Sequence, residues 1–338
     1  MTDACLCSWK HRTRIALTLF VSFVMGCFGY VHAQDERVIR PPGDKIIWCA
    51  AFAPDGRTIA AGLTDRVLLY DTASGRLLAS KTFESGKSTA YDDGEFVAGV
   101  DFSPDGKSLA VCCGRGALFL WEPLTGRIPV TLVGHKRSVE CGRFSPDGTL
   151  LATGSRDGIL LWEVEQRKVK FALGESGVTF NCIAFSPNGK VLASGTEANI
   201  VLWDVESGRK VHTLNPHKCE VRSIAFSPDG TTLVSGHRKV ACAWDVATGR
   251  MKGMVNFGES VTGLSVLSDN RTAIGASSNG VIRAWDLERQ TLLGSMTTKD
   301  QMSVLGMAIS PNERMILCVL DAMENHGIQL INLDRLRK

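Results

Sequence analysis

The stretch Gly134–Glu163 decides the fold, and it reads GHKRSVECGRFSPDGTLLATGSRDGILLWE. Short apolar runs alternate in it with the turn signal Pro146-Asp147-Gly148. Proline, aspartate and glycine in succession are typical of a tight turn. The spacing therefore predicts four short strands in this unit, at Ser138–Phe144, Leu150–Gly154, Ile159–Val164 and Lys168–Leu173. Strands that are apolar on both faces are expected where sheets stack on one another.

The same pattern recurs along the chain. An apolar anchor followed by the turn signal stands at Phe52, Phe102, Phe144, Phe185, Phe226, Val266 and Ile309, with spacings of 50, 42, 41, 41, 40 and 43 residues. A second series of pairs follows each anchor, at Tyr70-Asp71, Trp121-Glu122, Trp162-Glu163, Trp203-Asp204, Trp244-Asp245, Trp285-Asp286 and Ile331-Asn332. Both series count seven, which predicts seven structural units.

The two motifs together resemble the WD-repeat family, whose period is about 40–45 residues and whose units end in Trp-Asp. The resemblance implies an all-β fold, a seven-bladed β-propeller with four strands per blade. It also implies a buried hydrogen-bonded tetrad in the third unit, formed by His135, Thr153, Asp157 and Trp162.

Other units depart from this tetrad. The fifth keeps His217, Ser235 and Trp244 but has Lys239 in place of the aspartate. Blade rigidity must then come mostly from apolar packing, and the first, second and seventh blades depart furthest from the pattern. The last unit stops after its third strand, and the resemblance implies that Glu36–Arg40 supplies the missing fourth strand and so removes an exposed sheet edge.

The first 33 of the 338 residues have the features of an export signal. Three basic residues precede an apolar run from Ile15 to Tyr30, and small residues lead to a cleavage point after Ala33, which predicts a signal peptide at 1–33 and a propeller at 34–338. Alternatively, the segment ending in Gly26-Cys27 resembles a lipoprotein signal, in which Cys27 is lipidated. An uncleaved anchor or a misassigned start is a third possibility. The first two possibilities, a cleaved signal peptide and a lipoprotein signal, both predict export to the periplasm or cell envelope.

Charge argues against nucleic acid as a partner. Without residues 1–33 the chain retains 35 basic and 34 acidic residues, so it lacks the field that attracts phosphate backbones or anionic lipid. Membrane association is expected only through a lipid anchor.

The cysteines are expected to be structural and free. Three residues before each anchor, every unit carries a small residue: Cys49, Gly99, Cys141, Cys182, Ser223, Gly263 and Gly306. A position of this kind needs little volume, and free cysteine serves there as a small hydrophobe. The histidines fall at different blade positions, so no metal site is predicted. No cofactor motif, nucleophile elbow or other catalytic motif is found, so neither a cofactor nor a catalytic residue is expected.

Two features that differ between units are candidates for binding. The connection Glu84–Glu95 is about ten residues longer than its counterparts and carries Tyr91, Asp92, Asp93 and Glu95. It can also be an idle solvated loop, because loops tolerate insertions at little cost. The position four residues before each anchor varies in size and charge: Trp48, Ala98, Glu140, Asn181, Arg222, Thr262 and Leu305. We expect it near the mouth of the central channel, with Trp48 either a binding residue or a partly buried structural one.

These features favour a non-enzymatic scaffold of the bacterial cell envelope. It would be a monomeric propeller that binds a protein or peptide through one rim. Two alternatives stay open: a propeller enzyme, lyase- or lactonase-like, acting at the channel mouth, and a lipid-anchored accessory subunit of an envelope complex.

Overall fold

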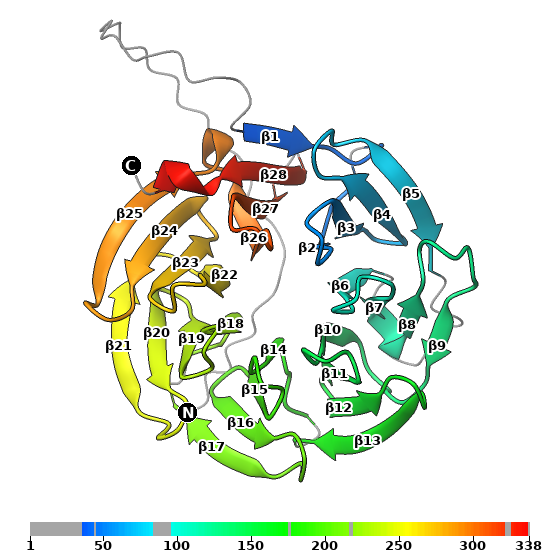
Figure 1. Ribbon diagram of the computed structural model, residues 1–338, viewed down its shortest axis with the longest axis horizontal. Helices are drawn as coiled ribbons and strands as arrows, with labels where there is room; N and C mark the ends of the chain where they lie inside the picture. Colours follow the sequence, from blue (N-terminus) through cyan, green and yellow to red (C-terminus); the bar gives the residue numbers. More distant parts are fainter. Residues whose placement is uncertain are drawn as a thin grey trace, which may run out of the picture. The chain divides into compact units, whose positions relative to one another are not determined.

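Seven four-stranded antiparallel sheets form a closed ring around a central channel (Figure 1). The computed structural model describes residues 36–43, 45–83, 96–174, 177–215, 219–321 and 326–336. In each blade the first strand lies at the channel and the fourth at the outer circumference. The predicted seven-bladed propeller is confirmed.

The strands of the first four blades follow the order of the chain. Blade 1 contains β2 (Cys49–Phe52), β3 (Thr58–Gly62), β4 (Arg66–Asp71) and β5 (Leu77–Thr82); blade 2 contains β6 (Val97–Phe102), β7 (Leu109–Cys113), β8 (Leu118–Trp121) and β9 (Val130–Leu132); blade 3 contains β10 (Val139–Phe144), β11 (Leu150–Ser155), β12 (Gly158–Glu163) and β13 (Lys168–Leu173); blade 4 contains β14 (Cys182–Phe185), β15 (Val191–Gly195), β16 (Ile200–Asp204) and β17 (Lys210–Leu214).

The last blade combines the two ends of the described chain. Blade 5 contains β18 (Ser223–Phe226), β19 (Thr232–Gly236), β20 (Val240–Asp245) and β21 (Met251–Asn256); blade 6 contains β22 (Val261–Val266), β23 (Thr272–Ser277), β24 (Val281–Asp286) and β25 (Thr291–Thr297); blade 7 contains β26 (Ser303–Ile309), β27 (Met315–Asp321), β28 (Gly327–Asn332) and β1 (Glu36–Ile39). Short 3₁₀ segments lie at η1 (Gly114–Gly116), η2 (Lys299–Gln301) and η3 (Leu333–Leu336).

The ring closes through its first strand. β1 pairs antiparallel with β28, from Glu36 opposite Ile331 to Ile39 opposite Ile328. The expected use of residues 36–40 as the outer strand of the last blade is confirmed. The outer edge of β28 is thereby covered by a strand distant in sequence.

The repeated turn is held by its own side chains. In the third blade the Ser145 hydroxyl donates to the Asp147 carboxylate at 2.6 Å, and Gly148 has a φ of 73°. The serine bonds Asp105, Asn188, Asp229 and Asn312 in four other blades in the same way. A positive φ suits glycine, which has no Cβ to clash. The motif therefore ends each first strand at the same point.

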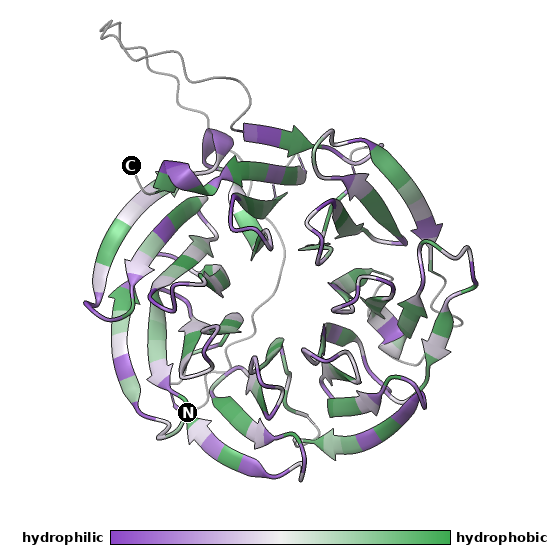
Figure 2. Ribbon diagram, viewed as in Figure 1, coloured by the Kyte–Doolittle hydropathy of each residue, from purple (hydrophilic) through white to green (hydrophobic). Residues whose placement is uncertain are grey.

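The core lies between the blades. Second and third strands are buried on both faces, as in β11, whereas the fourth strands alternate in exposure, as in β25. Figure 2 shows the corresponding mixture of hydrophobic and hydrophilic residues along the outer strands. Apolar burial between successive blades is therefore the main stabilising contribution, at roughly 25 cal/mol per Å² of buried apolar surface.

The small position in the first strand matches its neighbour in the second strand. Where the first strand has cysteine or serine, its register partner is glycine: Cys49 faces Gly62, Cys141 faces Gly154, Cys182 faces Gly195 and Ser223 faces Gly236. Where the first strand has glycine, the partner is larger: Gly99 faces Cys112, Gly263 faces Ala276 and Gly306 faces Val319. Each pair thus contains one glycine, so the two facing positions together hold a single side chain.

Three of these thiols also connect neighbouring blades. The sulfurs of Cys49, Cys141 and Cys182 lie 3.4, 3.5 and 3.7 Å from the carbonyl oxygens of Val97, Phe180 and Val221. Each carbonyl belongs to the start of the next blade. None of the eight cysteines from Cys49 onward forms a disulfide bond among the described residues.

Candidate functional site

The seven variable residues lie together around one mouth of the channel. Each stands directly before the small position, where the first strand begins, and the backbone N–H of Trp48, Asn181 and Arg222 donates to the carbonyl of the glycine across the hairpin at 2.8, 3.1 and 2.9 Å. They line a single cavity of about 200 Å³, together with Arg143 and residues of the first strands. We call these seven residues the mouth ring: Trp48, Ala98, Glu140, Asn181, Arg222, Thr262 and Leu305.

Trp48 presents an exposed aromatic surface at this mouth. Its exposed fraction is 41%, and its ring centroid lies 5.6 Å from that of Phe96 at an interplanar angle of 51°. Phe96 is the first described residue after the Glu84–Glu95 insertion. The described chain therefore resumes beside Trp48. Phe96 was not singled out by sequence reasoning, because its proximity depends on packing between blades 1 and 2.

Three polar residues of blades 4 and 5 converge at the mouth. Arg222 donates two hydrogen bonds to Glu220, at 3.0 and 2.9 Å, both to the same carboxylate oxygen. Asn181 Nδ2 lies 3.4 Å from the other oxygen of Glu220. Glu220 was missed by sequence reasoning, which compared the positions three and four residues before each anchor but not the position six residues before it. Its charge is paired with that of Arg222, so this side of the mouth is polar without a net charge.

The structure does not test the proposed binding residues of the insertion. Tyr91, Asp92, Asp93 and Glu95 fall outside the described residues, as do Cys27 and His217. Their assignments stay predictions.

The tetrad residues form a continuous set of hydrogen bonds inside blade 3. His135 Nδ1 lies 2.7 Å from Asp157 and His135 Nε2 lies 2.8 Å from the Thr153 hydroxyl. Trp162 Nε1 donates to the same hydroxyl at 2.8 Å. Burial lowers the pKa of His135, although Asp157 opposes the shift. A neutral imidazole that donates from Nδ1 to Asp157 and accepts at Nε2 from Thr153 satisfies every group.

A histidine also bonds the corresponding hydroxyl of blade 5. His237 Nε2 lies 2.8 Å from the Ser235 hydroxyl, which also accepts a hydrogen bond from Trp244 Nε1 at 2.8 Å. Sequence reasoning assigned His217 to the tetrad of this blade, and since His217 lies outside the described residues, that assignment stays a prediction. His237 follows the second strand of its own blade, so its contact arises from the local fold of the hairpin.

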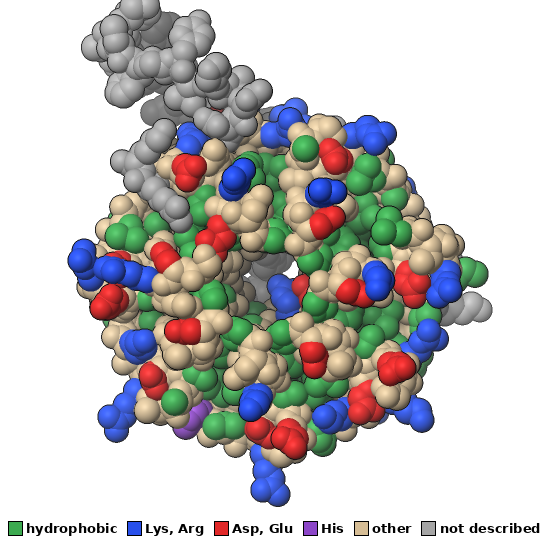
Figure 3. All heavy atoms as spheres, viewed as in Figure 1, with side chains coloured by type: hydrophobic (Ala, Val, Ile, Leu, Met, Phe, Trp, Pro, Cys, Tyr) green, Lys and Arg blue, Asp and Glu red, His purple; other side chains and the backbone are tan. Residues whose placement is uncertain are grey.

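A second cavity of about 470 Å³ lies in the channel where the first strands meet the repeated turns. It is lined by the residues directly before each anchor and by the turn prolines Pro104, Pro146 and Pro311. Figure 3 shows basic and acidic side chains side by side at the wall of the central opening. On the same face the other charged side chains are scattered rather than gathered by sign.

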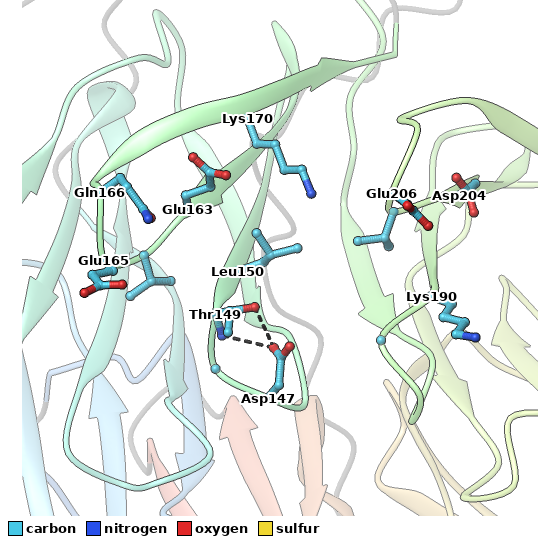
Figure 4. A pocket seen from close by; sticks show the side chains of 14 residues that line it. Asp147, Thr149, Leu150, Glu163, Glu165, Gln166, Lys170, Lys190, Asp204 and Glu206 are labelled. Atoms are coloured by element: carbon cyan, nitrogen blue, oxygen red, sulfur yellow. Dashed lines mark hydrogen bonds between the residues drawn. The ribbon is translucent and has the colours of Figure 1, made fainter.

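A further cavity of about 720 Å³ is an open groove between blades 3 and 4. Figure 4 shows Lys170 and Glu163 on one wall and Lys190, Asp204 and Glu206 on the other. Hydrogen bonds from Ser145 lower the pKa of Asp147, and those from Ser207 lower the pKa of Asp204. These carboxylates are held as anions by their own turns and are unsuited to act as general acids.

The thiols near the channel are also unsuited to nucleophilic chemistry. Burial raises the pKa of Cys49 and of Cys141 to about 12. A thiol in this state is rarely ionised at neutral pH, and the thiolate is the nucleophile. Among the described residues no group of three or more His, Cys, Asp or Glu side chains is placed to hold a metal ion.

The repeated turn, the blade-ending tryptophans and the ring of seven sheets define a WD-repeat-type propeller. The chain belongs to the family described as the IFT122 first beta-propeller, whose model matches residues 46–332.

Relatives match the chain over part of its length. It is 30% identical over 148 residues to the meiotic recombination protein rec14 of Schizosaccharomyces pombe, covering 41% of this chain and 46% of the relative. It is 33% identical over 101 residues to Protein NEDD1 of Bos taurus, covering 30% of this chain and 14% of the relative. It is 36% identical over 88 residues to the guanine nucleotide-binding protein subunit beta of Saccharomyces cerevisiae, covering 26% of this chain and 20% of the relative. The matches span less than half of each of these relatives.

No helix in the described ranges has the length and apolarity needed to cross a membrane.

Proposed function

We propose that this propeller is a non-enzymatic binding protein that engages a protein or peptide at the mouth ring. The observation that carries the proposal is the exposed Trp48, packed against the partly buried Phe96, beside a ring of unlike side chains. Large aromatic side chains that remain exposed on a rigid frame are typical of binding hot spots. The yeast relative is, by its name, one subunit of a guanine nucleotide-binding protein, which agrees with a role in assembly.

Replacing Trp48 tests the proposal directly. Trp48→Ala should weaken capture of the native partner by about 1–3 kcal/mol, because it removes an aromatic hot-spot residue. Quantitative capture from native extract, with wild type and variant compared side by side, measures the loss. Leu124→Ala is the matched control, since Leu124 is 90% exposed on the turn between β8 and β9. If the two variants capture equally, the mouth ring is not the binding surface.

The insertion extends the proposed surface. Phe96 places its end beside Trp48, and Tyr91 with Asp92, Asp93 and Glu95 would add an aromatic anchor and acidic charge. Tyr91→Ala should weaken capture by on the order of 1–3 kcal/mol without lowering the melting temperature. Neutralising the three acids should mainly slow association at low salt. Unchanged capture after replacing residues 84–95 by a short Gly-Ser turn would show an idle loop.

We further propose that the protein acts in the bacterial cell envelope after export. The basic start, the apolar run Ile15–Tyr30 and the small residues up to Ala33 support this location. The intact mass of the protein purified from its native source distinguishes a chain starting at Gln34 from one starting at an acylated Cys27. Recovery of the full-length chain from the cytoplasm would reject export.

A further inference from the structure

The channel wall carries an inner ring, which we define as the residue directly before each anchor, near the end of each first strand. Five units have a small residue there, and these are Ala51, Ala184, Ala225, Ser265 and Ala308. The other two, Asp101 and Arg143, belong to the neighbouring blades 2 and 3. The inner ring therefore carries its charge on one side and leaves open space elsewhere.

Arg143 connects the two halves of the channel. It lines both the inner cavity of about 470 Å³ and the mouth cavity of about 200 Å³, and it is the one inner-ring residue among those described that lines both. Its side chain keeps 48% of its surface exposed, even though it lies inside the ring. A ligand that enters past the mouth ring would meet this guanidinium.

The hydrogen-bonding capacity of Arg143 is largely unused by the described residues. Nη1 donates to the carbonyl of Gly142 at 2.9 Å, and this is its only hydrogen bond to the described part of the chain. A guanidinium has five N–H donors arranged as a planar fork that matches a carboxylate. Arg222 at the mouth differs, because Glu220 already accepts two of its donors.

Asp101 is hydrogen-bonded to a backbone N–H rather than to Arg143. Its Oδ2 accepts the backbone N–H of Phe144 at 2.8 Å, a contact from blade 2 to blade 3. Its Oδ1 lies 3.9 Å from Arg143 Nη1, beyond hydrogen-bond distance. Asp101 therefore moderates the positive charge of Arg143 without occupying the fork.

We propose that the channel binds one carboxylate at Arg143, carried by a segment of the protein partner that enters past the mouth ring. The mouth cavity is smaller than the roughly 300–1,000 Å³ of drug-sized ligand sites, so it suits a single side chain or chain end. The nearby carboxylates of Asp101 and Glu140 repel a doubly charged phosphate more than a singly charged carboxylate. The inference depends on the proposed function in one respect, namely that the partner is a protein.

Titration with acetate tests the site without any partner. The full chain is labelled with ¹⁵N, and the arginine Nε–H resonances are followed at constant ionic strength as chloride is replaced by acetate. We expect a saturable shift of the Arg143 resonance, a loss of binding of at least tenfold in Arg143→Gln, and less than a twofold change in the control Arg127→Gln, whose side chain is 75% exposed on the turn between β8 and β9. Asp101→Asn should tighten acetate binding severalfold, because it removes the competing charge and keeps an oxygen to accept the N–H of Phe144. If Arg143→Gln does not fold, the effect of Asp101→Asn on acetate binding tests the proposal instead.

Two peptides distinguish the source of the carboxylate. One is a glycine peptide with a free C-terminus, and the other is an amidated peptide with one internal glutamate. Either peptide binding in an Arg143-dependent manner supports the proposal and identifies the source. A linear, non-saturating response to acetate, equal losses in the two arginine variants, or tighter binding of phosphate than of acetate would overturn it. Failure of the proposed function would be seen separately, as unchanged partner capture by Trp48→Ala.

Discussion

A single hydroxyl group decides whether the tryptophan of a blade is hydrogen-bonded. Nine residues before the blade-ending aromatic, blades 3, 4 and 5 have Thr153, Ser194 and Ser235, and each hydroxyl accepts the indole N–H at 2.8 or 2.9 Å. Blade 6 has Ala276 at this position, and the N–H of Trp285 has no acceptor among the described residues although the side chain is 1% exposed. A buried donor without a partner is destabilising.

Ala276→Ser should therefore stabilise the propeller. The new hydroxyl would occupy the position of Ser235 in blade 5 and accept the indole N–H of Trp285. We expect a gain of about 1 kcal/mol in the free energy of unfolding, measured by chemical denaturation. The reverse change, Ser235→Ala, is the control and should cost about 1–3 kcal/mol. A destabilised Ala276→Ser variant would show that the site has no room for the oxygen.

The size match between first and second strands gives a second prediction at this scale. A Cβ added at Gly154 would lie 2.8 Å from the sulfur of Cys141 and 3.0 Å from the carbonyl of Phe180. Gly154→Ala should destabilise the fold, and adding Cys141→Gly should recover part of the loss. A double-mutant cycle measures the coupling, which we expect between 0.5 and about 3 kcal/mol. Additive effects would mean that the two side chains do not compete for the same space.

His135 gives the blade a pH-dependent stability. Burial lowers its pKa in the folded state, so the unfolded chain binds the proton first as the pH falls below about 6.5. The stabilisation by neutral His135 is fully present above that pH and is lost progressively below it. The difference in unfolding free energy between wild type and His135→Asn should shrink as the pH is lowered from 8 to 5. A constant difference would mean that His135 does not titrate differently in the two states.

At the scale of strands and blades, the repeated motif predicted most of the fold. In blade 3 the fourth strand was predicted without error at Lys168–Leu173, and the other three were shifted by at most one residue. The Ser-Pro-Asp-Gly turn and the aromatic ending are local signals, so each strand could be located within its own unit. Phe96, Glu220 and His237 could not be found in this way, because their roles depend on pairing across a hairpin or between blades.

Strand β1 should be essential to the closed ring. Deleting residues 34–41 would expose the outer edge of β28, and an unpaired edge is a template for association with other chains. We expect aggregation or a large loss of cooperative stability, measured by light scattering and thermal unfolding. As a control, deletion of residues 337–338 leaves every paired strand intact. A soluble, cooperatively unfolding variant without residues 34–41 would show that the seventh blade is stable with three strands.

At the scale of the whole molecule, each unit contributes one residue to every ring along the channel. The small position is uniform because neighbouring first strands crowd there, whereas the mouth ring and the inner ring face open space and can differ. Specificity within the channel is therefore expected from the combination of seven single residues. This division also explains why Trp48, Asp101 and Arg143 depart from their counterparts without disturbing the blades.

The buried thiols should report on the integrity of the complete ring. Burial raises the pKa of Cys49, Cys141 and Cys318 to about 12 and raises that of Cys112 and Cys182 as well. Alkylation at pH 8 requires thiolate and access, so these five should resist modification in the native protein and react after denaturation. Mass spectrometry of the alkylated peptides measures both states.

Loss of β1 should make these thiols accessible to the alkylating reagent in a definite order. Cys318 lies in β27, next to the strand that β1 covers, so the variant lacking residues 34–41 should become reactive there before it does at Cys141 on the far side of the ring. Simultaneous exposure of both thiols would indicate that the ring opens as one cooperative unit. We assign these cysteines as thiols without disulfide bonds that pack between blades. Two or more disulfide-linked pairs in the denatured, unreduced protein would contradict this assignment.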